Sequence, residues 1–281
     1  MSLARRTLDK MSDLAYIGTS SGRGLSPRIW RNCPIEYYKS NVEQGMFWMD
    51  DFKGGYNQAT NTAITKLEGA VYGFTENTTN SLITTSVTDD DGILVLGADD
   101  DGKGTTVLAL CGSGAGGMIE LPATKKFWYE TRLAVNMVTD AKISFFVGIC
   151  DKALGTAAGI VAAAGTGIND INCVGFSVLE ADSNMIDCIW KNKGVTQVTT
   201  GNDAAAIVIN TYTKLGMYGD GYSVTFTKDG VPIYTTPSTT HAGTGFPNVA
   251  GENMCLALAL MSGHSDGCAM SVDWLAFAQE V

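Results

Sequence analysis

Two Asp-Gly turns near the C-terminus constrain the fold of this chain more than any other feature. Asp220-Gly221 and Asp229-Gly230 each stand between short segments in which apolar and polar residues alternate. Glycine adopts a positive φ without steric cost, so Asp-Gly suits the tight turn that joins two antiparallel strands. The expected strands are Lys214–Tyr218, Tyr222–Thr227, Val231–Tyr234, Asn253–Met261 and Met270–Ala278. This part of the chain therefore predicts an antiparallel β-sheet.

The preceding part of the chain has the same character. In Lys126–Val138, odd-numbered positions such as Phe127 and Leu133 are apolar, and the opposite side carries Glu130 and Arg132. A period of two predicts a strand with one buried face. Further expected strands are Phe47–Phe52, Ala70–Thr75, Ser81–Thr88, Gly92–Gly97, Thr105–Cys111, Met118–Leu121, Lys142–Cys150, Cys173–Glu180, Met185–Asn192 and Val195–Thr200. Together they predict an all-β chain folded as an antiparallel β-sandwich over residues 46–281.

Composition narrows the class of protein. The chain has 281 residues, of which 45% are hydrophobic, with seven cysteines and two histidines. No N-terminal signal peptide and no apolar run of about 18 residues is visible, so we expect a cytosolic chain that does not enter a membrane. The cysteines form no CxxC pair, which predicts free, buried thiols. With so few histidines, we expect no metal site and no cofactor. Leu154–Gly167, rich in Ala and Gly, predicts a mobile loop or a short helical turn.

Charge separates residues 1–45, here called the arm, from the rest. Residues 1–49 carry a net charge of +3 and the remainder carries −13, which gives the total of −10. A body this acidic argues against nucleic-acid binding. The arm predicts docking onto a negatively charged partner, although an ordinary first strand with scattered solubilising charge is the alternative. Guanidinium groups and one aromatic side chain are the candidate contact residues, namely Arg5, Arg6, Arg23, Arg28, Trp30 and Arg31.

Three motifs suggest chemistry without completing it. Gly112–Gly117 matches GxGxxG, but Pro122 follows where a dinucleotide site needs a helix. The acidic turns at 89–91 and 99–101 lack the EF-hand ligand ladder, so we interpret them as solubilising hairpin tips rather than calcium sites. Glu180-Ala181-Asp182 is similar to the start of a glycosidase signature, but its third carboxylate is missing. We therefore expect no enzyme activity.

Four segments together resemble a family of tailed-bacteriophage virion proteins. They are Ser2–Arg6, Phe47–Phe52, Tyr222–Val231 and Val272–Glu280. The resemblance implies a concanavalin-like, jelly-roll-type sandwich and the role of a capsid decoration, or cement, protein. This chain departs from the family by its longer arm, residues 7–45.

The resemblance also implies a location and partners. Such proteins sit as homotrimers on the capsid exterior of the virion, contact the major capsid protein and are assembled in the host cytoplasm. The resemblance then implies that the arm residues bind the capsid and have no catalytic role. The alternative is a carbohydrate-binding module on a virion tail or fibre, which requires exposed aromatic side chains. Trp128 and Trp190 are its candidates, but both lie in expected strands and are more typical of core residues.

Overall fold

The computed structural model describes most of the chain after the first 22 residues. The described residues are 23–52, 57–58, 73–76, 81–86, 92–98, 102, 104–110, 117–138, 142–151, 159–162, 165, 167–179, 184–196, 198–199, 202–241, 243, 245–248, 252–263 and 267–281. Within them, the helices α2 (Pro27–Trp30) and α3 (Ile35–Ser40) are both short. Neither is long and apolar enough to cross a membrane.

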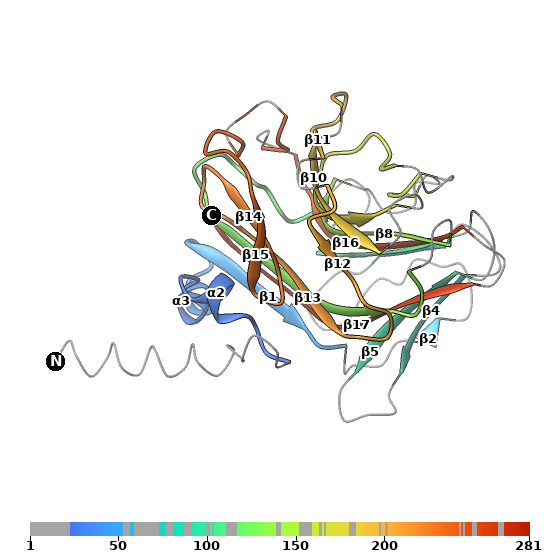
Figure 1. Cartoon of the computed structure of the whole chain (residues 1–281). Coiled ribbons are helices and arrows are strands. Elements are labelled where there is room, and N and C mark those ends of the chain that lie inside the picture. Colours follow the sequence, from blue (N-terminus) through green and yellow to red (C-terminus); the bar gives the residue numbers. More distant parts are fainter. Residues whose placement is uncertain are drawn as a thin grey trace.

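Two antiparallel sheets form a β-sandwich (Figure 1), which confirms the predicted fold class. The first sheet has the order β15 (Val231–Thr235), β14 (Val224–Lys228), β13 (Thr213–Gly219), β7 (Phe127–Val135), β17 (Cys268–Glu280), β5 (Ile93–Ala98), β4 (Ser81–Ser86) and β2 (Asn57–Gln58). Strand β1 (Gly45–Asp50) pairs with the C-terminal half of β17.

The second sheet has the order β11 (Val198–Thr199), β10 (Met185–Lys191), β9 (Cys173–Val178), β8 (Ile143–Cys150), β16 (Cys255–Ser262), β6 (Gly104–Ala109) and β3 (Gly73–Glu76), with β12 (Ala205–Ala206) beside β10. Met118–Leu121, predicted as a strand, contributes only an isolated bridge between Ile119 and Met254.

Both Asp-Gly turns form as predicted. Asp229 and Gly230 have φ angles of 51° and 72°, the left-handed pair that a tight hairpin requires. At the other turn, Gly221 has a φ of 93°, and the Asp220 carboxylate accepts the backbone N–H groups of Tyr222 and Ser223 at 2.8 and 2.7 Å. Local hydrogen bonding and glycine freedom therefore fix the register of β13, β14 and β15.

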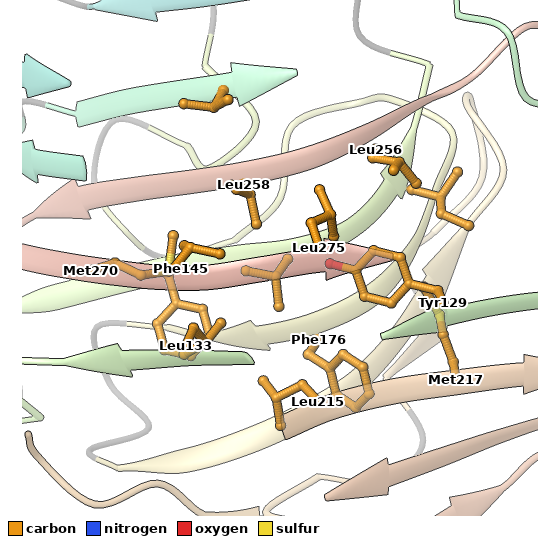
Figure 2. Close-up of a cluster of buried hydrophobic side chains, with 14 of the residues drawn as sticks. Tyr129, Leu133, Phe145, Phe176, Leu215, Met217, Leu256, Leu258, Met270 and Leu275 are labelled. Atoms are coloured by element: carbon orange, nitrogen blue, oxygen red, sulfur yellow. The ribbon is translucent and has the colours of Figure 1, made fainter. Parts of the chain in front are cut away.

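The main core lies between the sheets, and Figure 2 shows its side chains meeting from both sides. From the first sheet come Tyr129, Leu133 and Leu275, and from the second come Phe145 and Phe176, all with 0–1% exposure. Alternation along each strand places these residues on one face. Trp128 and Trp190 are also buried, as expected for core residues.

Each sheet is also covered on its outer face. Over the second sheet, Ile160, Val161 and Ile168 pack on outward residues such as Phe146 and Ala257. The described residues of the Ala/Gly-rich segment therefore belong to a packed cover, in which a bridge joins Val161 to Ile168, the residue directly after the segment. Because of this cover, β8 and β16 are buried on both faces.

The arm covers the outer face of the first sheet. Helices α2 and α3 lie on the side of that sheet away from the second sheet (Figure 1), where Leu25, Ile29, Trp30, Ile35 and Tyr38 pack against it in a buried cluster. The prediction that β7 has only one buried face is therefore wrong. Trp128 and Glu130 on its outward side are both 0% exposed, since the arm excludes water from them.

Six of the seven cysteines are described, and all six are buried free thiols. Burial raises the pKa of Cys173 to about 12 and that of Cys188 to about 12, with the Asp187 charge adding to the latter.

These buried thiols should be protected from modification. In the native protein at pH 8, we expect a thiol reagent to modify at most Cys111, which lies outside the described residues. After unfolding, it should modify all seven cysteines. A C111S variant should then be unreactive when native. Rapid modification of this variant would contradict the burial.

Candidate functional site

The structure places the predicted arm residues in different environments. Arg5 and Arg6 lie outside the described residues. Trp30 is fully buried, whereas Arg28 and Arg31 are exposed on the arm surface. Arg23 reaches back to the first sheet instead of pointing to solvent alone. The contact with a capsid stays a prediction, and the described part of the arm folds onto its own chain.

Asp273 anchors the start of the described arm. It lies at an irregularity in β17, where pairing with β7 shifts register between Val272 and Trp274, and it is 1% exposed. Its carboxylate accepts the Arg23 Nε–H at 3.0 Å and forms ion pairs with both Arg23 and Arg132. This bond raises the pKa of Arg23. The Arg132 guanidinium also stacks on Tyr212, 4.3 Å from the ring centre.

Glu130 forms a second anchor beneath helix α2. Its Oε2 accepts the backbone N–H of Ser26 and the indole N–H of Trp30, each at 2.9 Å. The buried Lys214 ammonium donates to the Gly24 carbonyl at 3.1 Å. Burial raises the pKa of Glu130, while the Ser26 and Trp30 bonds and the Lys214 charge partly offset it. The arm thus supplies two hydrogen bonds to one oxygen of this buried carboxylate, which offset part of the cost of burying it.

A groove of about 440 Å³ lies where the arm meets strand β1. Its lining combines aromatic, apolar and charged side chains: Lys39, Phe47, Trp48, Met49 and Asp51. Because side chains alternate along β1, Trp48 packs toward the core between the sheets, while Phe47 and Met49 pack toward the arm. Lys39 comes from α3, with its ammonium 5.4 Å from the Phe47 ring centre.

The turn after β1 fixes the charged end of this groove. Phe52 has a φ of 55° and is fully buried in the main core. The Asp50 carboxylate accepts the Phe52 backbone N–H at 2.7 Å, which stabilises this left-handed turn. Asp51, between them, lines the groove. Sequence analysis predicted this segment as a strand and as part of the virion-protein resemblance, but not as the lining of a groove. The aromatic pair and the two aspartates close together in the sequence were the available signal.

Elsewhere, at one end of the second sheet, the carboxylates of Asp151 and Glu252 share a hydrogen-bond donor. The Asn172 side-chain N–H group donates to Asp151 Oδ2 at 2.8 Å and also to Glu252. Burial raises the pKa of Asp151, although its bonds from Asn172 act in the opposite direction. Both acids bind one amide, which ties the ends of β8, β9 and β16 together. In the described part of the chain, no cluster of three or more potential metal-ligating residues occurs. Glu180, Asp182, residues 112–116 and the acidic turns fall outside that part.

Comparison with known proteins identifies the fold. No protein-family model and no curated protein matches the sequence. An endo-1,3-beta-glucanase from Streptomyces sioyaensis is similar in structure, with a TM-score of 0.50, 11% identity and coverage of 83% of this chain and 95% of the glucanase. A glycoside hydrolase family protein from Mycobacterium thermorestibile has a TM-score of 0.50 and 14% identity, over 82% and 99% of the two chains. A protein of unknown function from Shewanella oneidensis has a TM-score of 0.49 and 11% identity, over 100% and 95%.

The glucanase and the glycoside hydrolase family protein share the sandwich fold of this chain. They also correct the expectation that the chain is not an enzyme, because two of the structures that share the fold are named as hydrolases. The absence of a complete glycosidase signature was too narrow a basis for excluding catalysis. The comparisons support the phage resemblance in its sandwich fold, but they identify no capsid decoration family.

The Glu130 anchor leads to a stability prediction. Replacing Glu130 with Ala removes the acceptor of two buried N–H groups, and each unsatisfied group costs about 1–3 kcal/mol. We expect Glu130→Ala to lower the free energy of unfolding by roughly 3 kcal/mol in urea titrations. Glu130→Gln, whose amide oxygen still accepts, is the matched control and should lose much less. Equal losses in the two variants would show that these hydrogen bonds do not stabilise the arm.

The difference in stability between Glu130→Gln and the native protein should depend on pH. Because burial raises the folded-state pKa of Glu130, its contribution to stability is present below its ordinary pKa, near 4.3, and declines as the pH rises through the raised value. Gln does not titrate. The stability of Glu130→Gln relative to the native protein should therefore increase from pH 4 upward. A difference that stays constant with pH would contradict this assignment.

Proposed function

We propose that the protein binds carbohydrate, in the groove beside strand β1. The observation that carries this proposal is the lining of the groove, in which two aromatic residues, Phe47 and Trp48, are combined with the charged residues Lys39 and Asp51. Aromatic rings pack against the C–H face of a sugar ring, and charged groups form strong hydrogen bonds with hydroxyl groups. The shared fold of the two glycoside hydrolases supports the same class of ligand.

The size and position of the groove also fit this class of ligand. A volume of about 440 Å³ lies within the usual range of small-molecule sites. The Trp48 side chain is held by the main core, and Phe47 is held by the arm cluster. Because both residues are held by packing, little conformational entropy is lost when a ligand binds beside them.

A glycan array followed by calorimetry tests the proposal. We expect the native protein to bind at least one glycan, and Trp48→Leu to weaken binding by about 2 kcal/mol, roughly thirtyfold in Kd. Lys39→Ala should also weaken it. Tyr222→Ala is the control, because Tyr222 is an exposed ring, 59% accessible, that does not line the groove. Measuring reducing-end release from the bound glycan tests for hydrolysis. Binding to no glycan, or loss of binding only in Tyr222→Ala, would refute the proposal.

A second candidate is the capsid decoration protein that the sequence resembles. The specific observation in its favour is that segments of the resemblance meet in the fold. Strand β1, with Trp48, pairs with the end of β17, where Trp48 lies opposite Phe277. Asp273, from the same closing segment, anchors Arg23 of the arm. We propose that a protein of this kind would bind the major capsid protein as a homotrimer through exposed arm residues, of which Arg28 and Arg31 are described.

Co-sedimentation with expanded capsids that lack the protein tests this candidate. Truncation of the arm is unsuitable, because it would expose the apolar face around Trp128 and Trp274. We expect native protein to pellet with the capsids and the double variant Arg28→Ala, Arg31→Ala to pellet less. Lys193→Ala, which removes an exposed charge from the second sheet, should behave as native. If the native protein remains in the supernatant, the capsid is not its partner.

A further inference from the structure

The arm forms one wall of the groove. Lys39 belongs to helix α3, so it lines the groove only while the arm is docked. Phe47 and Met49 belong to β1, but their side chains pack on the buried arm cluster. Of the five lining residues, these three therefore depend on the arm for their position. Trp48 packs on the main core and does not.

The residues that hold the arm lie outside the groove. Glu130 on β7 and Asp273 on β17 do not line it, yet together they bind Arg23, Ser26 and Trp30. Both carboxylates are almost completely buried, with exposures of 0% and 1%. Displacement of the arm would separate Arg23 from Asp273 and leave the Ser26 and Trp30 N–H groups without their acceptor, so these contacts favour one geometry.

Trp30 links the Glu130 anchor to the groove. Its indole N–H donates to Glu130 at 2.9 Å, and its ring meets the Phe47 ring edge-on, with centroids 5.9 Å apart and an interplanar angle of 82°. Trp30 is 0% exposed and is therefore confined by its neighbours. A shift of Trp30 away from Glu130 would remove the support of Phe47 and, through the arm, of Lys39.

We propose that Glu130 and Asp273 are positioning residues of the groove. They fix the arm, and the arm holds Lys39, Phe47 and Met49 where a bound sugar would contact them. The functional consequence rests on the proposed carbohydrate site, whereas the structural relation between the two anchors and the groove can be measured without any sugar.

Hydroxyl-radical footprinting with mass spectrometry measures that relation. Native protein is compared with Glu130→Ala and Asp273→Ala, and oxidation is quantified at Phe47, Met49 and Trp48. Asp187→Ala is the matched control. It removes a buried carboxylate, 5% exposed, from β10 of the second sheet, where Asp187 accepts the Asp203 backbone N–H at 2.9 Å. Labelling is carried out at a temperature well below the unfolding transition of each variant.

We expect oxidation of Phe47 and Met49 to rise several-fold in both anchor variants, with little change at Trp48 and no change in Asp187→Ala. Unchanged oxidation of Phe47 and Met49 in the anchor variants would overturn the proposal. So would an equal rise in Asp187→Ala, because general destabilisation would then explain the effect.

The glycan that the native protein binds on the array supplies the second readout. Both anchor variants should bind it roughly tenfold more weakly, as should Lys39→Ala. If the footprint changes but affinity does not, the arm does not shape the site and the positioning role is refuted. If the native protein binds no glycan, the carbohydrate proposal fails, and the footprint alone still decides whether the anchors set the groove.

Discussion

The hydrogen bonds to the buried Glu130 carboxylate are the interaction on which the arrangement of the arm depends. A carboxylate on the outer face of a sheet is ordinarily solvated, but here Trp128, Trp274 and the arm exclude water from it. Burying such a group without partners is costly, and the arm provides two N–H donors at the required place. The sheet therefore needs the arm both as an apolar cover and as a source of hydrogen bonds.

The described part of the molecule has four layers rather than two. The arm covers the first sheet, and the described residues of 159–171 cover the second. Central strands buried on both faces carry nearly continuous apolar runs, as β8 and β16 do. The groove lies beside β1, the strand whose two faces pack on the main core and on the arm cluster.

The relation between fold and function follows from the same geometry. A sandwich of this kind serves hydrolases, so the fold permits both binding and catalysis, and the side chains of the site decide between them. In the groove, aromatic and charged groups are combined, with one carboxylate among the lining residues. The carbohydrate and virion proposals share the arm, which shapes the groove in one and exposes Arg28 and Arg31 in the other.

The sequence by itself determined the strands and their turns. Alternation and Asp-Gly turns depend on neighbouring residues, so Asp229-Gly230 predicted its hairpin correctly, and the free cysteines were correctly expected to be buried. Only the tertiary structure decided what the outward faces contact. Glu130, Asp273 and Trp30 are separated by up to 243 positions, and no local pattern shows that the arm will pair Arg23 with Asp273 and donate hydrogen bonds to Glu130 on its own sheet. The groove followed from that docking, because three of its lining residues take their positions from long-range packing.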